Sequence, residues 1–265
     1  MGINKKILYP TCLCFILLSI QSVYAIPQQS PAGGNYLTLD ESHDSLRTDR
    51  AWFSLSKFKE LTVEMWLYID RFPDEGIYWS IIGQEGRFEV AAANTGEFPT
   101  ISVWNNCEEC GCANMETTHI PVGEWIYVVA TFFASSGIFV NGQGDQPCVD
   151  GGNVVTSNKV LRIGGVIPKG PKELWSLWTG EKLQGYIDEL RISSVVRYTI
   201  ETRKNLPNKR FEVDKDTICL WHFDEKPDKT VYVDVSGNGY DLHRDNVFAV
   251  QSQSKLSTTW AKLKR

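Results

Sequence analysis

Short runs of alternating apolar and polar residues recur along the chain, and this pattern restricts the fold more than any other feature. In residues 61–69 every odd position is Leu, Val, Met or Ile, and the even positions are Thr, Glu, Trp and Tyr. Because successive side chains of a strand point to opposite faces, this run predicts a strand with one core face and one amphipathic face. Similar strand-like runs occupy residues 81–83, 88–90, 100–104, 125–133, 137–142, 159–165, 186–192 and 217–223.

Turn-forming residues separate these runs, and the sequence between them shows no long amphipathic helix pattern. Gly, Asn, Asp, Ser and Pro gather at residues 94–96, 135–137, 150–152 and 168–171. Many short strands joined by such turns are typical of two antiparallel sheets packed face to face. We therefore predict an all-β, two-sheet antiparallel sandwich with few or no long helices, in one domain over residues 33–246.

The first 25 residues have the composition of a signal peptide rather than of a folded segment. Lys5 and Lys6 precede a mostly apolar run over residues 7–20, and Ala25 ends the segment with a small side chain. The apolar run is shorter than the ~20 residues that span a bilayer, so a membrane anchor is the less favoured interpretation. We expect cleavage after Ala25 and a secreted or cell-surface chain without membrane insertion, beginning with a short linker over residues 26–32.

The charge of the chain argues against some classes of partner. The formal net charge is −5, and removal of Lys5 and Lys6 with the signal peptide makes it −7. An acidic chain is a poor partner for nucleic acid or an anionic membrane surface, whereas it is compatible with cations and neutral sugars. Aromatic residues make up 12% of the chain, including nine Trp, which suits both strand surfaces and carbohydrate-facing surfaces. The polar tail over residues 247–265 is expected to be loosely held.

Several segments, taken in order, resemble the laminin-G-like family of concanavalin-A-like lectin and glucanase domains in its secreted bacterial form. Each segment is weak alone, and their order over about two hundred residues makes the resemblance specific. The resemblance implies a jelly-roll arrangement of the sandwich, and calcium is common in such domains. The segments are residues 36–40, 61–68, 123–132, 138–142, 161–165, 185–193, 220–225 and 234–239.

One departure from the family pattern concerns the C-terminal segment. In relatives, a Trp-x-Phe-Asp-Glu strand and an Asp-x-Ser-Gly-Asn-Gly turn often open the domain, whereas here residues 221–225 and 234–239 come at its end. Either residues 217–243 close the same sandwich in a permuted strand order, or they begin an incomplete second unit. Too few residues follow to build another core, so closure is the favoured interpretation.

The C-terminal turn is the best candidate for a metal site. Asp234, Ser236 and Asn238 place oxygen-bearing side chains at alternate positions, and oxygen ligands suit a hard cation such as calcium. The alternative is a tight turn whose glycines supply positive φ angles. Asp188 is a second candidate, because it shares strand parity with two apolar residues that follow it and so points toward an apolar face. Its partner is either a cation shared with Asp234 or backbone N–H groups and an arginine.

Five cysteines remain after the signal peptide is removed. Cys107, Cys110, Cys112 and Cys148 lie in expected loops, and export would permit two disulfide bonds among them. A zinc loop built on the first three of these cysteines is the alternative. Cys219 lies in an apolar strand pattern, which predicts a buried free thiol.

Tryptophans in expected loops are the candidates for ligand contact. Trp175 and Trp178 lie in one such loop, and Trp79 and Trp104 are weaker candidates of the same kind. The alternative for the loop pair is that it folds back over the sheet. The tryptophans of predicted strands are instead expected to be packed, namely Trp66, Trp125 and Trp221.

Motifs of catalysis are missing from the sequence. It contains no Glu-x-Asp-x-x-Glu strand of the kind that glycosidases on related sandwiches carry, no Gly-x-Ser-x-Gly elbow and no His-Glu-x-x-His array. We therefore expect a non-catalytic module that binds carbohydrate or glycoconjugates, with structural calcium as its cofactor. The alternatives are a protein-interaction or adhesion domain of the cell surface without a sugar site and, less favoured, a polysaccharide hydrolase.

Overall fold

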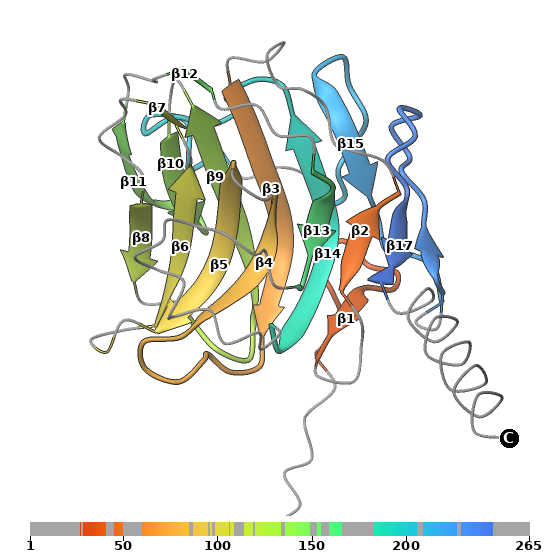
Figure 1. The fold of residues 1–265 in the computed structure, drawn as a ribbon, viewed down its shortest axis with the longest axis horizontal. Helices are drawn as coiled ribbons and strands as arrows, with labels where there is room; N and C mark the ends of the chain where they lie inside the picture. Colours follow the sequence, from red (N-terminus) through yellow and green to blue (C-terminus); the bar gives the residue numbers. More distant parts are fainter. Residues whose placement is uncertain are drawn as a thin grey trace, which may run out of the picture.

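The computed structural model describes residues 27, 29–40, 45–49, 60–84, 87–94, 96, 99–105, 107–108, 114–118, 120–133, 136–148, 153–154, 159–165, 183–205, 209–226 and 229–245. Two large sheets pack face to face, and a two-stranded piece lies beside them (Figure 1). The described residues contain no α-helix, and hence no helix that could cross a bilayer. The predicted all-β sandwich is therefore confirmed, whereas the expected signal peptide lies outside the described residues.

The strand order is not the chain order, because segments far apart in the sequence pair with each other. The first sheet has the order β1, β14, β3, β9, β10 and β11, with β15 also paired to β14. The second sheet has the order β16, β17, β2, β13, β4, β5, β6 and β8, and β12 pairs with β7. The bounds are β1 (Leu37–Leu39), β2 (Leu46–Thr48), β3 (Glu60–Ile69), β4 (Tyr78–Gln84), β5 (Phe88–Asn94), β6 (Pro99–Asn105), β7 (Cys107–Glu108), β8 (Asn114–Thr118), β9 (Trp125–Phe133), β10 (Ser136–Val140), β11 (Gln143–Cys148), β12 (Asn153–Val154), β13 (Leu161–Ile163), β14 (Gly185–Ser193), β15 (Thr217–Trp221), β16 (Val231–Tyr232) and β17 (Leu242–Arg244).

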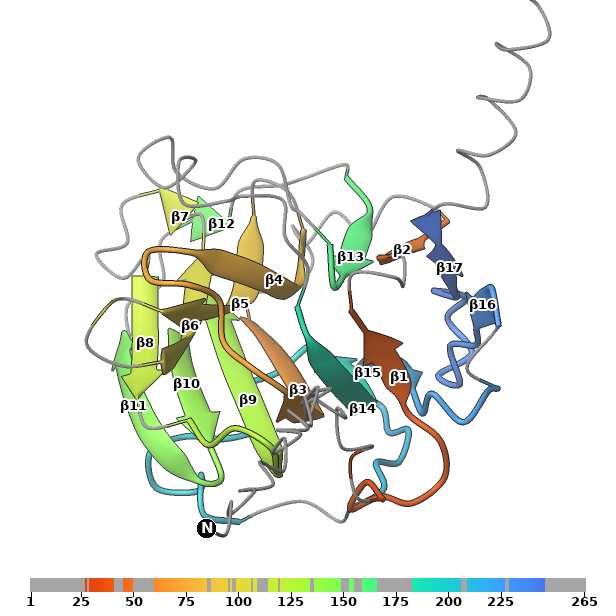
Figure 2. The ribbon, with the colours of Figure 1, turned by 90° about the horizontal axis from the view of Figure 1, so that it is seen from below.

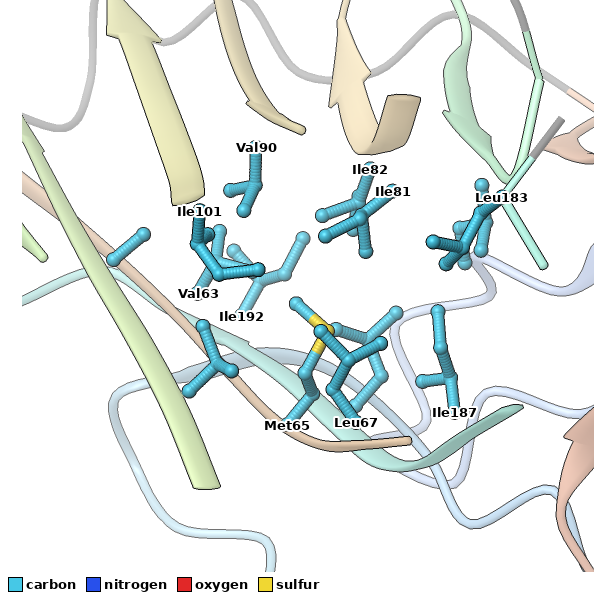
Figure 3. Close-up of a cluster of buried hydrophobic side chains, with 14 of the residues drawn as sticks. Val63, Met65, Leu67, Ile81, Ile82, Val90, Ile101, Leu183, Ile187 and Ile192 are labelled. Carbon is cyan, nitrogen blue, oxygen red and sulfur yellow. The ribbon is translucent and has the colours of Figure 1, made fainter. Parts of the chain in front are cut away.

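The main core lies between the two sheets, and the alternation in β3 shows how the sequence builds it. The odd-numbered residues of β3 belong to this core, and Val63, Met65 and Leu67 are fully buried (Figure 3). Ile82 and Ile101 approach them from the second sheet. The even-numbered residues therefore point away from the second sheet, onto a side that we call the outer face of the first sheet.

The C-terminal segment contributes strands to both sheets. β15 pairs with β14 of the first sheet, with Leu190 opposite Trp221. β17 pairs with β2 of the second sheet, with Leu242 opposite Thr48. Figure 2 shows these strands beside the N-terminal ones, so both ends of the domain meet at one edge of the sandwich.

The cysteines are described in part. Cys219 is fully buried and free, as the apolar pattern around it predicts, and burial raises the pKa of its thiol well above its usual value. Cys107 and Cys148 lie on β7 and β11, whereas Cys110 and Cys112 fall outside the described residues. The two disulfide bonds therefore stay a prediction.

Candidate functional site

The strand register places four side chains in a row across the outer face of the first sheet. Thr38 on β1 pairs with Tyr186 on β14, Tyr186 with Tyr68 on β3, and Tyr68 with Trp125 on β9. Residues that pair directly across strands have neighbouring side chains on the same face. The apolar residues next to them in each strand belong to the main core, so the row points outward.

Tyr36 joins three of these side chains in what we call the four-ring cluster: Tyr36, Tyr68, Trp125 and Tyr186. The ring centroids of Tyr36 lie 5.2 Å from Tyr186 and 5.6 Å from Trp125, and those of Tyr68 lie 5.5 Å and 5.6 Å from the same two rings. Neighbouring ring planes are inclined by 60–78°, close to the edge-to-face arrangement that aromatic pairs prefer. Tyr68 is 7% exposed and the other three rings are half-buried, so the cluster is packed and still reaches the surface.

A surface cavity of about 510 Å³ adjoins the four-ring cluster. Tyr36 and Tyr186 form part of its wall, and Gln29, Asn35 and Thr38 add amide and hydroxyl groups. Ligand sites commonly combine aromatic faces with a few polar groups that fix orientation, in cavities of roughly 300–1,000 Å³. The cavity and the cluster together form a continuous candidate binding surface.

Two carboxylates border this surface at the end of the sheet. Asp40 follows β1 and Asp70 follows β3, and the backbone N–H of Asp70 donates to the carbonyl of Gln184, just before β14, at 3.0 Å. Burial and then the charge of Asp40 raise the pKa of Asp70. Burial, with a further contribution from Asp70 and nearby groups, raises the pKa of Tyr186 to about 12, so this phenol stays neutral at physiological pH.

Another part of the outer face is covered by the connection between β14 and β15, which we call the covering connection (residues 194–205 and 209–216). The indole N–H of Trp66 donates to the carbonyl of Lys209 at 2.8 Å. Phe211 packs in a second apolar cluster with Trp66. Trp66 is therefore covered, whereas Tyr36, Trp125 and Tyr186 of the four-ring cluster stay partly exposed.

Glu64 is fully buried on this covered side and ties the covering connection to the sheet. The hydroxyl of Tyr127 donates to its carboxylate, Arg191 Nε donates to Oε1 at 2.8 Å, and Arg197 Nε lies 3.4 Å from the same oxygen. Arg197 also forms a two-bond pair with Asp214 at 2.7 and 2.8 Å. That hydrogen-bonded guanidinium holds the pKa of Asp214 well below its usual range.

A second group of charged residues lies where the partner of β14 changes. β1 pairs with residues 185–187 of β14 and β15 with residues 190–193, so these two strands follow one another along the same edge of β14 (Figure 1). Asp188 and Glu189 lie between these pairings, where the register of β14 against β3 shifts. Glu189 has a positive φ of 52°, and both carboxylates are fully buried.

Glu189 is satisfied by groups from the C-terminal half of the chain. Its carboxylate accepts the backbone N–H of Phe211 at 2.8 Å and lies 2.8 Å from Nδ1 of His222. Arg210 lies 3.6 Å from Glu189 and forms a closer pair with Asp224 at 2.6 Å. These contacts give Glu189 a structural role at the bulge of β14.

Asp188 keeps one oxygen without a hydrogen-bond partner among the described residues. Its Oδ1 accepts the backbone N–H of Glu189 at 2.8 Å, whereas the buried Oδ2 has no donor. Burial raises the pKa of Asp188 to about 7, although the hydroxyl of Ser30 has a lowering effect. An open buried carboxylate oxygen fits a hard cation. In the described part of the chain no three His, Cys, Asp or Glu side chains gather as metal ligands, so a cation at Asp188 would also need backbone carbonyl oxygens.

The Asp234 turn is held by hydrogen bonds within the protein. One oxygen of Asp234 accepts the backbone N–H groups of Leu220 and Ser236 at 3.1 and 3.0 Å, and the other accepts that of Tyr240 at 3.0 Å. The side-chain amide of Asn238 donates to carbonyl groups of β15. Asp188 takes part in none of these bonds, and a calcium ion shared by Asp188, Asp234, Ser236 and Asn238 stays a prediction.

The four tryptophans expected to contact a ligand have different surroundings. Trp175 and Trp178 lie outside the described residues. Trp79 is fully buried in the main core, with the guanidinium carbon of Arg71 4.8 Å from its ring centroid, because residues around it form β4 rather than a loop. This corrects the expectation that Trp79 contacts a ligand. Trp104 is half-buried on β6 and stays a prediction.

Comparison with known proteins identifies the fold family. A family model described as the concanavalin A-like lectin/glucanases superfamily matches residues 32–201. The chain belongs to this superfamily. The resemblance seen in the strand motifs is thereby confirmed. No curated protein sequence matches the chain.

Solved structures of the same fold are distant in sequence. A Bacteroides ovatus ATCC 8483 protein proposed to bind carbohydrate is 19% identical with a TM-score of 0.52, over 79% of this chain and 59% of that chain. Our chain thus spans about three fifths of that relative's length. Domain 4 of an extracellular arabinanase from Geobacillus stearothermophilus, in complex with arabinotriose, is 15% identical with a TM-score of 0.42, over 68% of this chain and 85% of that domain. The likeness to the Bacteroides ovatus protein shows the fold alone.

The sequence pattern of the superfamily did not predict the four-ring cluster. Trp125 packs against the second apolar cluster, as expected for a tryptophan of a strand, and it is still half-buried on the outer face. The available signal was the parity of β3, since Trp66 and Tyr68 occupy even positions opposite the core face. That signal alone does not distinguish the covered Trp66 from the cluster beyond it.

Proposed function

We propose that this member of the superfamily is a secreted, non-catalytic carbohydrate-binding module whose ligand lies on the four-ring cluster and in the adjoining cavity. The observation that supports this most is the cluster itself, three of whose rings are half-exposed beside a cavity with amide and hydroxyl groups. Sugars present apolar C–H faces together with hydroxyls, so they bind where aromatic faces and a few polar groups converge. The carbohydrate-binding proposal made for the Bacteroides ovatus protein of the same fold agrees with this function.

The geometry of the cluster also suits binding because its rings are fixed before a ligand arrives. Tyr68, Trp125 and Tyr186 belong to paired strands, and each ring contacts two neighbours at 5.2–5.6 Å. Side chains that are already ordered lose little conformational entropy on binding, which raises affinity. An ordered aromatic cluster on the outer face of the paired strands is therefore a favourable platform for a sugar chain.

The binding prediction is tested by substituting one ring. Trp125→Ala is expected to lower affinity for the preferred glycan about tenfold or more, because a central aromatic contact commonly contributes ~1–2 kcal/mol to binding. N-terminal sequencing of the exported protein first checks that the chain begins at Ile26. A glycan array with this chain then identifies the glycan, and calorimetry measures the affinity of the variant for it. Product analysis of the same mixtures is expected to show no cleavage.

Trp104→Ala is the matched control, since Trp104 is also half-buried but lies on β6 of the second sheet. It is expected to leave affinity for the glycan unchanged. Equal affinity of wild type and Trp125→Ala, with both folded by circular dichroism, would contradict the proposed surface. Glycan binding that is lost in Trp104→Ala would move the site to the second sheet.

We further propose a structural calcium ion at Asp188 rather than at the Asp234 turn. Calcium at the open Oδ2 would replace the proton that burial favours there, so it should raise the melting temperature by mass action on the folded state. Asp188→Asn is expected to abolish this rise, whereas Asp234→Asn, where it folds, should keep it. Differential scanning calorimetry with calcium or chelator measures both, and an unchanged melting temperature of the wild type in millimolar calcium would refute the site.

The pH dependence without calcium follows from the same carboxyl group. The pKa of Asp188 is about 7 in the folded chain, above the ~3.9 of an unfolded aspartate, so the folded state holds the extra proton between these values. In chelator this group therefore makes the free energy of unfolding fall as pH rises through that interval, and the fall is complete above pH 7. Urea unfolding of wild type and Asp188→Asn is expected to show this component only in the wild type.

A further inference from the structure

Two carboxylates lie beside the four-ring cluster and give this part of the surface negative charge. Asp40 and Asp70 directly follow β1 and β3, on either side of Gln184, at the same end of these strands. By strand alternation, Asp40 follows the parity of Thr38, and Asp70 that of Tyr68, so both belong to the outer face. They therefore lie beside the row, two residues beyond Thr38 and Tyr68 along β1 and β3, rather than in the core.

The four-ring cluster and the two acids beside it favour the binding of a positively charged group. Aromatic faces attract cations through the ring quadrupole, and carboxylates attract them directly. The phenol of Tyr186 stays neutral because its pKa is about 12, and burial likewise raises the pKa values of Tyr36 and Tyr68. The rings therefore present neutral faces next to two acids.

The two acids lie on either side of β14, and the charge of one acts on the other. Burial and then the charge of Asp40 raise the pKa of Asp70, so a second negative group at this position is unfavourable. An anionic sugar would add to that repulsion, whereas an ammonium group between the carboxylates would relieve it. The formal net charge of the whole chain is −5, which also favours a cationic ligand over an anionic one.

We propose that the ligand of this surface is an oligosaccharide of amino sugars with free ammonium groups, whose charge is recognised by Asp40 and Asp70 beside the four-ring cluster. This inference rests on the proposed carbohydrate-binding function and assigns the charge class of its ligand. The rings contact the sugar faces, and the two carboxylates select the unacetylated amine.

The test compares two oligosaccharides that differ in the amine alone: a β-1,4-linked glucosamine hexamer and its N-acetylated form. Calorimetry is done with chelator present, at a mildly acidic pH where the sugar amines are protonated. The glucosamine hexamer is expected to bind about tenfold more tightly, since two partly exposed ion pairs of ~0.5–1 kcal/mol each give a factor of this size. Added salt should reduce this preference and leave binding of the acetylated hexamer unchanged.

Asp40→Asn/Asp70→Asn is expected to remove most of the preference without changing affinity for the acetylated hexamer. The matched control is Asp74→Asn/Glu75→Gln, which removes the same charge from exposed positions of the β3–β4 connection and should keep the preference. Equal binding of both hexamers, with Trp125→Ala weakening both, would overturn the charge inference and leave the proposed function standing. If neither hexamer nor any arrayed glycan binds, the proposed function fails too. Hexalysine binding as tightly as the glucosamine hexamer, unaffected by Trp125→Ala, would overturn recognition of a sugar.

Discussion

Replacing Glu64 with alanine is expected to lower the free energy of unfolding by about 3–5 kcal/mol, since removing one partner of a buried ion pair leaves uncompensated charge. Glu64 is fully buried, and the side chains of Arg191 and Arg197 beside it are only 9% and 15% exposed. Without the carboxylate, these guanidinium groups face each other and the phenol of Tyr127 under the covering connection. Urea unfolding measures the loss, which corresponds to roughly 6–20 °C in melting temperature.

The same substitution should loosen the covering connection before the rest of the sandwich. Limited proteolysis is expected to cut Glu64→Ala in this connection faster than the wild type, because Arg191 and Arg197 lose the carboxylate that ties it to β3. Glu64→Gln keeps the side-chain volume and isolates the effect of charge. Glu124→Ala, at an exposed position, serves as the control and is expected to change stability by at most about 0.5 kcal/mol. A loss below about 1 kcal/mol for Glu64→Ala would show that the buried pair contributes little.

Replacing Gly185 with alanine is expected to lower the free energy of unfolding by about 3 kcal/mol, because the added methyl group would have no space. A Cβ at Gly185 would lie 2.0 Å from the backbone carbonyl oxygen of Tyr68 on the paired strand β3. The strands must separate at this point, and the separation displaces Tyr68 from its partner Tyr186. Melting temperature and glycan affinity should therefore fall together.

Gly237→Ala separates this steric effect from the usual cost of replacing glycine. Gly237 has a positive φ of 81°, and an added Cβ there meets no atom within 4 Å. Its substitution carries only the backbone strain of about 1 kcal/mol and should leave glycan affinity unchanged. A Gly185→Ala protein as stable as Gly237→Ala would mean that β14 and β3 adjust without cost.

The strands and the sandwich could be predicted because they depend on local patterns. The alternation in residues 61–69 places Val63, Met65 and Leu67 in the core, as expected from strand geometry alone. Cys219 was predicted as a buried free thiol for the same reason, since apolar neighbours in a strand define a core position. Such features follow from residues adjacent in the chain.

The candidate site depends instead on segments far apart in the chain. Trp66 and Tyr68 share one face of β3, yet Trp66 is covered through Lys209, and Tyr68 belongs to the four-ring cluster. Nothing in residues 61–69 distinguishes them, because the cover comes from a segment more than a hundred residues away. Asp188 shows the same limit, since its oxygen without a partner among the described residues lies where the pairing of β14 with β1 ends and its pairing with β15 begins.

The sequence by itself determined that this chain is an all-β sandwich of the concanavalin A-like superfamily, because alternation, turn residues and motif order are local and ordered along the chain. Only the tertiary structure decided which outward-facing aromatic residues meet and stay accessible. Cross-strand register brings Tyr186 beside Tyr68 and Tyr68 beside Trp125, and the covering connection, which covers Trp66, leaves Tyr186 and Trp125 partly exposed. Register and cover arise from long-range packing, where the energies of many contacts act together, so no short stretch of sequence encodes them.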